Sequence, residues 1–300
     1  FWADLPPEED KLRVRGFLGP MASIPYRAIP ISPAATMNND EFNWMIRDRL
    51  GIVQSAAAHL QGSNCQTCNR PFGNGYHCRV CKRNAGPIHV HDAVVRGVCT
   101  MAREAGYVAR LEPRQLIAGS AVRPADVFIE GLDLSKAGDD TAVDVAVYDN
   151  RGNYGPAVRA RQLKDPSATA VHAEAQKRNR KLRGTNMTRE QHLKTRNISF
   201  APLGFTVAGV AGATWSSILK KISDHAASRK GHNAQYFRRR WTVRLAMTLA
   251  KRGAAAALRR ARAAHRELPA SVEDCDILGA QATEAVLTVD EDYHPLPLPT

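Results

Sequence analysis

Three cysteines and a histidine lie close together in the sequence, and their types and spacing suit a metal ion. Cys65 and Cys68 are separated by two residues, and His77 and Cys81 by three. Two thiolates at this spacing can hold one side of a tetrahedral Zn²⁺ ion, and a second pair further along the chain can close the site. We therefore expect a structural zinc ion bound by these four residues, with no coordination position left to activate water.

The neighbourhood of this cluster leaves two questions open. Cys78 is an alternative to His77, and its use would give four thiolates in place of three thiolates and one imidazole. His89 and His91 follow at the expected start of a helix, as further ligands, as active-site groups or as polar residues of the helix start. Unrelated buried cysteines are the plainest alternative, which we disfavour because chance rarely places two Cys-x2-Cys pairs so close.

The remaining cysteines and the composition favour an intracellular protein. Cys99 and Cys275 stand alone, whereas a secreted disulfide framework would distribute its pairs along the chain. No apolar run approaches the ~18 residues of a membrane span, and the first residues do not have the pattern of a secretory signal. The sequence begins at Phe1 and not at Met, so we expect it to be part of a longer polyprotein.

Three carboxylates fall in or beside segments that have the sequence of strands. They are Glu112, Asp126 in Arg-Pro-Ala-Asp, and Asp144 in Ala-Val-Asp-Val-Ala-Val. A carboxylate among Val and Ala is costly to bury unless it is paired or binds a metal. Carboxylates on neighbouring strands can hold Mg²⁺ against a phosphodiester, and a nearby lysine would stabilise the developing charge. The alternative is that Asp144 faces solvent on an edge strand.

The net charge of +13 is concentrated in one part of the chain. Residues 151–268 carry 26 basic and 5 acidic groups, residues 1–150 carry 16 and 17, and residues 269–300 carry 7 acidic groups and no basic group. A basic block attracts polyanions, of which nucleic acid is the commonest in the cell. The alternative is a solvated helix surface. The arginines that we expect to bind phosphate are Arg238, Arg239, Arg240, Arg244, Arg259 and Arg260.

Hydrophobic periodicity predicts an α/β fold, a mixed sheet flanked by helices. Asp40 or Asn39 should cap the first helix, and Gly51 should end it. Helices are expected at 40–52, 91–108, 171–183, 214–229 and 233–268, and strands at 108–113, 125–132, 141–149 and 198–209. The expected domains are an irregular and helical lead-in at 1–60, a zinc knuckle at 61–90, an α/β domain ending in basic helices at 91–268 and a flexible acidic tail at 269–300.

The order of these motifs resembles a known family. HDAVVRGV, LEP, RPADVFI, AVDVAV, AEAQK and FAPLGF follow one another in the chain. They are similar to the restriction-like endonuclease region at the C-terminus of reverse-transcriptase polyproteins of non-LTR retrotransposons and related mobile elements. In that family a CCHC knuckle of this spacing lies just upstream, after a helix resembling EFNWMIRDRLGI. The resemblance covers residues 40–260, and it favours His77 over Cys78 because the family spacing needs three residues before Cys81.

The resemblance implies the PD-(D/E)xK nuclease fold and a catalytic site within residues 91–268. Asp126 and Asp144 would hold catalytic Mg²⁺ or Mn²⁺, and Glu112 would match the early glutamate of the family. The chain departs from the family pattern because no lysine lies two residues after the second acid. Members of the family often draw this lysine from the following helix, where Lys177 is the first candidate and Lys181 the second.

These expectations lead to a function and a rival. We expect a Mg²⁺-dependent endonuclease, with a zinc knuckle, that nicks target DNA for retroelement integration; in the family the freed 3′-hydroxyl primes reverse transcription. The expected partners are DNA, element RNA and a reverse transcriptase in the same polyprotein, and the expected location is the nucleus. The rival is a nucleic-acid-binding protein with the same knuckle and basic helices but an inactive nuclease site.

Overall fold

The computed structural model describes most of the chain up to residue 267. The described residues are 8–19, 21–28, 35–73, 75–81, 86–113, 116, 124–134, 140–151, 154–181 and 186–267. Cys275 and the acidic tail expected at 269–300 therefore lie outside the described residues.

A four-stranded mixed sheet forms the centre of the fold. Its order is β1-β2-β3-β4, with β1, β2 and β3 antiparallel and β4 parallel to β3. β3 and β4 pair along their whole length, from Asp140 opposite Ile198 to Tyr148 opposite Thr206. Their sequences are nearly continuous apolar runs, as is usual for strands covered on both faces. The strands are β1 (Ala109–Leu111), β2 (Val127–Ile129), β3 (Asp140–Tyr148) and β4 (Ile198–Thr206).

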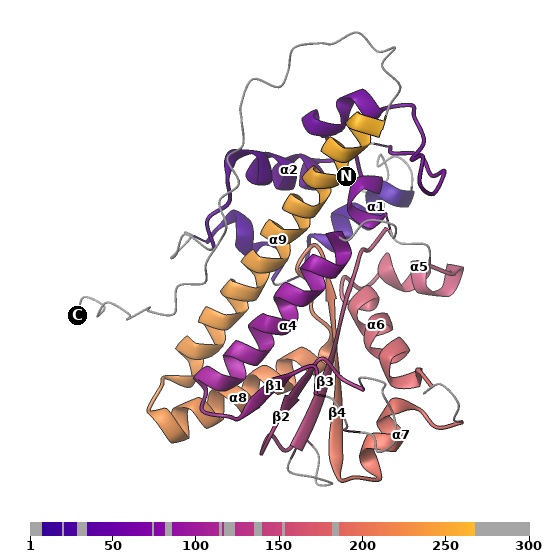
Figure 1. Cartoon of the computed structure of the whole chain (residues 1–300). Coiled ribbons are helices and arrows are strands. Elements are labelled where there is room, and N and C mark those ends of the chain that lie inside the picture. The colour runs from indigo at the N-terminus through magenta and orange to yellow at the C-terminus, as the bar shows by residue number, and fades with distance from the viewer. Residues whose placement is uncertain are drawn as a thin grey trace, which may run out of the picture.

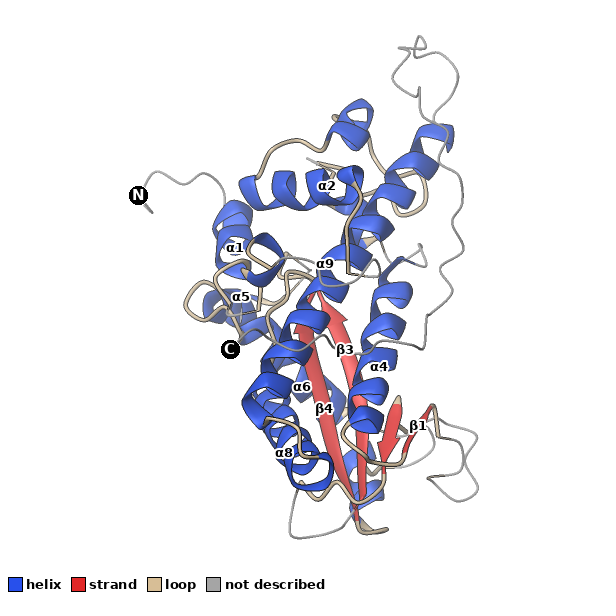
Figure 2. Cartoon of the chain, turned by 90° about the vertical axis from the view of Figure 1, so that its left-hand side faces the viewer, coloured by secondary structure: helices blue, strands red, loops and turns tan. Residues whose placement is uncertain are grey.

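Helices cover both faces of this sheet (Figures 1 and 2). Alternate residues of a strand point to opposite faces, so Val143 and Val145 face one helical layer while Ala142 and Asp144 face the other. The first layer contains α4 (Gly86–Glu104), α8 (Ala213–Lys230) and α9 (Ala234–Glu267). The second contains α6 (Ala168–Asn179) and α7 (Arg189–Lys194), with α5 (Pro156–Gln162) beside α6.

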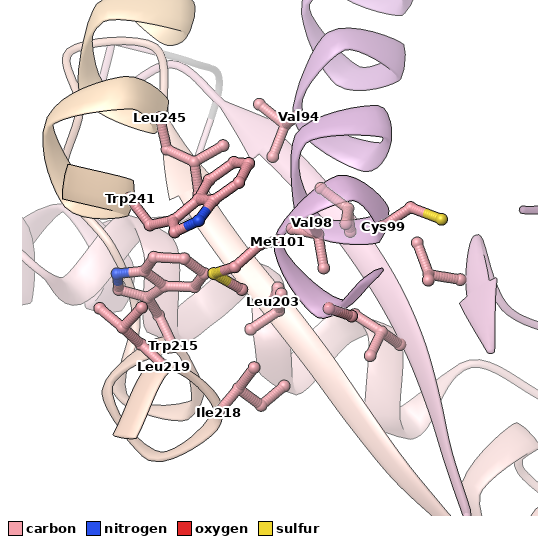
Figure 3. Packing of buried hydrophobic residues seen from close by; sticks show 14 of the residues in the cluster. Val94, Val98, Cys99, Met101, Leu203, Trp215, Ile218, Leu219, Trp241 and Leu245 are labelled. Atoms are coloured by element: carbon pink, nitrogen blue, oxygen red, sulfur yellow. The ribbon is translucent and has the colours of Figure 1, made fainter. Parts of the chain in front are cut away.

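The larger core lies between the sheet and the first layer (Figure 3). Val94, Val98 and Met101 of α4 recur at spacings of three and four, so they lie on one face of the helix, and all three are fully buried. Trp241 and Leu245 of α9 pack against them. On the opposite face α6 approaches β4 so closely that a Cβ on Gly204 would lie 2.0 Å from the carbonyl oxygen of Ala170, and only glycine fits there.

The structure corrects the expected N-terminal region. The lead-in contains α1 (Glu8–Gly16) and the short helix η1 (Ile24–Tyr26), although its prolines favoured irregular structure. The first predicted helix is α2 (Asn39–Leu50), and Asn38 caps it, not Asn39 or Asp40, because its side chain accepts from Glu41 N. Gly51 ends α2 in the left-handed conformation at φ 74°, as predicted. Two further short helices complete this region, η2 (Ser55–Leu60) and α3 (His77–Val80).

The other predicted elements are confirmed with shifted ends. α4 begins five residues before the expected start and ends before Gly106, and β1 and β2 are shorter than the predicted strands. The predictions missed α5 and α7. The turn expected at 138–140 lies mostly outside the described residues.

A buried ion network joins the cysteine-rich segment to α2 and to the end of β3. The guanidinium of Arg79 contacts Asp48 and lies 2.5 Å from Asp149. Arg151 donates to Asp48 at 2.8 Å, and its guanidinium lies 3.9 Å from the centre of the Tyr76 ring. Burial alone would raise the pKa of Asp48, but Arg79 and Arg151 hold it below its ordinary value. The network therefore keeps the Asp48 carboxylate ionised in the interior.

We predict that Asp48→Asn destabilises the protein strongly. It removes one of the two carboxylates of a buried network and leaves Arg79 and Arg151 to share the single charge of Asp149, so the free energy of unfolding should fall by about 3–5 kcal/mol. Asp224→Asn is the matched control, because Asp224 is 48% exposed and pairs with Lys220 at the surface, so its loss should cost less than about 1 kcal/mol. Urea denaturation measures both; equal losses would contradict the assigned role of the network.

Candidate functional site

The cysteine cluster is built on a tight turn followed by one helical turn. The carbonyl of Cys65 accepts from the backbone N–H groups of Cys68 and Asn69, and Asn69 adopts a positive φ of 54°. This turn brings the first two thiols to the same side of the backbone. His77 is the first residue of α3 and Cys81 follows its last residue, so one short helix presents the second pair.

The four expected ligands converge on one point. The ligand atoms of Cys65, Cys68, His77 and Cys81 all lie within 4.8 Å of one another. The sulfurs of Cys65 and Cys81 are 4.0 Å apart, close to the ~3.8 Å that a tetrahedral ion with Zn–S bonds of ~2.3 Å requires. Cys68 Sγ lies 3.1 Å from His77 Nε2. The cluster can hold a metal ion such as zinc.

The alternative ligand Cys78 is not part of this group. Its side chain is buried in the small apolar core beneath the cluster, which also contains Trp44, Leu60 and Phe72. Burial raises the pKa of its thiol to about 12, so this side chain stays protonated. The geometry thus selects His77, as the resemblance implied.

One side of this small core belongs to α9. Ala254, Ala257, Ala261 and Ala264 recur at spacings of three and four, and all are buried against the cysteine-rich segment. Small side chains let the helix approach closely. The knuckle is therefore packed on the C-terminal half of α9, and its fold depends on residues far along the chain.

Arg260 of α9 reaches into the cysteine cluster, so it does not present its charge to solvent. It is 6% exposed, and it donates to Cys65 Sγ at 3.1 Å and to Thr67 Oγ1 at 3.2 Å. Burial alone would raise the pKa of the Cys65 thiol, but the hydrogen bond from Arg260, helped by backbone N–H groups, lowers it to about 5. The thiolate is the form that binds metal. The expectation that Arg260 binds nucleic acid is corrected by this burial.

Asp126 ends the loop before β2 and lies directly against β3. Its backbone N–H donates to Val143 O at 2.9 Å, and its carboxylate oxygen Oδ2 accepts from Val145 N at 2.7 Å. The same oxygen lies 3.2 Å from Nε2 of His91, a residue of α4. Burial opposes ionisation, but these hydrogen bonds lower the pKa of Asp126. The second oxygen, Oδ1, makes no hydrogen bond to the described residues.

His91 is held between two carboxylates. Its Nδ1 lies 3.1 Å from Asp92 Oδ1, and its Nε2 also lies 3.2 Å from Val145 O. Burial alone would lower the pKa of His91, but the hydrogen bonds to Asp126 and Asp92 raise it to about 9. The structure thus places His91 beside Asp126, just before β2, and not among the converging cysteine ligands.

Asp144 is almost fully buried between two cations. It is 2% exposed, and Lys177 Nζ of α6 lies 2.7 Å from its Oδ1. Arg189, the first residue of α7, lies 2.8 Å from its Oδ2. Burial raises the pKa of Asp144, and the two cations counter that rise while the charge of Asp126 adds to it. Residues from β3, α4, α6, α7 and the loop before β2 thus form one charged cluster.

Two expected residues lie at the edge of this cluster or beyond it. Glu112 follows β1 with an exposed side chain and a positive φ of 44°, and its backbone N–H donates to Asp126 O at 2.7 Å. Lys181 lies just past α6, exposed, and its backbone bridges to Thr188. The structure therefore brings Lys177, and not Lys181, to Asp144.

Sequence reasoning missed Arg189 and Glu174. Thr188 and Gln191 form a capping box at the start of α7, a recognisable signature that could have located this helix and its first residue. Glu174 is 5% exposed and accepts from the backbone N–H groups of Gly204 and Thr214. Burial raises the pKa of Glu174, and its three-residue spacing from Lys177 places both on one face of α6.

The basic residues of α9 differ widely in their surroundings. Arg240 and Arg244 pair with Glu104 of α4. Arg239 and Arg259 are exposed and make no hydrogen bond or ion pair with the part of the chain that the structure describes. The expected nucleic-acid-binding residues are thus partly used to hold the helices together.

The fold and the site define a mixed α/β protein with a four-stranded sheet and a Cys3His cluster able to hold a metal ion. No protein-family model matches the chain, and no curated protein is detectably similar to it. Within the described residues, no helix combines the length and apolar character needed to cross a membrane.

We predict that Arg260→Met weakens zinc binding. Loss of a group that hydrogen-bonds a metal ligand typically lowers metal affinity about 10–100-fold. Arg259→Met is the matched control, because Arg259 is the preceding residue, is exposed and does not contact the cluster. Competition with a chromophoric chelator measures both affinities. Equal affinities for the two variants would show that Arg260 does not support the site.

We also predict which side chains bind the metal. Cys78→Ala should retain one zinc ion per chain, whereas His77→Ala and Cys81→Ala should lose it, because only the latter two belong to the converging group. Metal content of the purified proteins and the visible absorption of their Co²⁺ forms provide the measurement. Loss of the metal in Cys78→Ala together with its retention in His77→Ala would instead identify four thiolates as the ligands.

Proposed function

We propose that the protein is a metal-dependent DNA endonuclease with the PD-(D/E)xK fold, of the kind joined to reverse transcriptases in non-LTR retroelements. One observation carries the proposal: Lys177 Nζ lies 2.7 Å from Asp144, close to Asp126, which immediately precedes the neighbouring strand β2. Two carboxylates on adjacent strands and a lysine from the following helix are the groups that the family resemblance implies. The mixed sheet between two helical layers is compatible with that fold.

The donor set suits Mg²⁺ or Mn²⁺. Such ions prefer oxygen ligands, and Asp126 and Asp144 would supply them. Asp126 Oδ1 is available, because the hydrogen bonds of this carboxylate are made by Oδ2. Two cations already surround Asp144, which shows that this point of the fold attracts positive charge. When bound, the ion would polarise the phosphoryl group and lower the pKa of a water molecule.

The protein's own residues would position and stabilise the reacting groups. Lys177 is placed to counter negative charge that develops on phosphorus. Arg189 holds the second oxygen of Asp144, and His91 together with Val145 N fixes Asp126. The knuckle and the exposed arginines of α9 would contact the nucleic acid. In this proposal the partners are DNA and element RNA, and the site of action is the nucleus.

One observation favours an inactive nucleic-acid-binding protein as the second candidate. Both oxygens of Asp144 accept from cations, and Arg189 lies 9% exposed against one of them. A metal ion would have to share Asp144 with these groups or displace one of them. If they hold the carboxylate too firmly, binding persists without cleavage.

We predict that the wild-type protein nicks supercoiled plasmid with Mg²⁺ or Mn²⁺, and that Asp126→Asn and Lys177→Met each slow nicking by about 100-fold or more. Agarose gels follow the conversion to open circles. Both side chains are partly exposed, so these variants should remain folded, which thermal melting checks.

Two controls match these variants. Asp133→Asn changes an exposed carboxylate after β2, and Lys181→Met removes the second candidate lysine; both should nick like the wild type. Nicking that survives in Asp126→Asn and Lys177→Met would refute the assigned site. A wild-type protein that binds DNA but does not nick it would establish the second candidate.

A further inference from the structure

A hollow of about 730 Å³ lies between η1 and the first turns of α9. Arg27 and Ile24 line one side, and Gln235, Arg238, Arg239 and Thr242 line the other. The four α9 residues follow one another at spacings of three, one and three, so they form a single stripe on the helix. We call this hollow the basic groove.

The basic groove carries positive charge that the described residues leave largely unpaired. No acidic residue is among the described residues that line it. Arg239 is exposed and has no hydrogen bond or ion pair within the described ranges, and Arg27, also exposed, donates only to Ser23 Oγ. Arg238 lies 3.9 Å from Asp224, at the limit of an ion pair. Three guanidinium groups therefore face a single, distant carboxylate.

This arrangement differs from that of several other arginines of α9. Arg240 and Arg244 point to Glu104, and Arg262 donates to Asp40 at 2.7 Å. A helix face that opposes another segment of the protein is usually apolar and packed. Here Arg238 and Arg239 stand beside an open space that Ile24, Ala28 and Val243 also line, and none of the described residues lining it carries a charge that pairs with theirs.

We propose that the basic groove binds the phosphodiester backbone of a nucleic acid strand. Guanidinium groups pair with phosphate through two parallel hydrogen bonds, and Gln235 adds an uncharged donor. The proposal deepens the proposed function and rests on it, because it states where the strand lies. It adds Arg27, a residue far from α9 in sequence. The groove is formed by η1 and α9, whereas Asp126, Asp144 and Lys177 lie outside these two helices.

Binding of a labelled oligonucleotide tests the proposal without cleavage, in buffer without added divalent cations. Arg27→Gln and Arg239→Gln should each weaken binding roughly tenfold and reduce the slope of log K against log salt by about 0.7–0.9. Arg161→Gln is the matched control, an exposed arginine on α5 that makes no ion pair with any described residue; it should leave the slope unchanged. Fluorescence anisotropy at several salt concentrations gives both quantities.

The result separates this proposal from the nuclease. Binding is measured without divalent cations, so a protein that never nicks DNA still reports on the groove. Equal weakening in Arg161→Gln and Arg239→Gln would overturn the proposal, because it would mean that only the overall charge matters. Displacement of the oligonucleotide by millimolar inorganic phosphate at constant ionic strength would also overturn it, in favour of an isolated anion site.

Discussion

The arrangement of the molecule depends on one buried guanidinium, that of Arg79. It belongs to the short helix between two expected metal ligands, and it contacts a carboxylate of α2 and another at the end of β3. A buried arginine is tolerated only where paired charges and hydrogen bonds compensate for lost hydration. These contacts help to fix the orientation of the knuckle relative to the sheet, because Arg79 joins it both to α2 and to the end of β3.

The same constraint explains how the strong positive charge of the chain is distributed. Arginines in α3, α7 and α9 enter the interior and neutralise carboxylates or a thiolate, as Arg79, Arg189 and Arg260 do. Others connect helices through Glu104. Only part of the basic block therefore remains for a polyanion, and Arg239, exposed and unpaired among the described residues, is the clearest remaining group on α9. Net charge alone overstates the surface available for binding.

The sequence was most informative where one local pattern determines the outcome. Cysteine spacing located the metal ligands, and the apolar runs located β3 and β4, because each depends on residues close in the chain. Lys177 was identified through the family resemblance, while its contact with Asp144 arises from the crossover between parallel strands. The part played by Arg189 and the contact of Arg260 with Cys65 escaped prediction because their partners lie 45 and 195 residues away. No local periodicity contains that information.

The packing of α9 against the knuckle has a consequence for synthesis of the chain. Cys65 and Arg260 are separated by 195 residues, and the ribosome makes the N-terminal partner first. The small core under the cysteines includes Ala257 and Ala261 of α9, so it stays incomplete until α9 emerges from the ribosome. During this interval the thiols can take up metal but lack the arginine and the apolar cover that complete their surroundings. The core of the knuckle is therefore completed late, only after almost the whole described chain has been made.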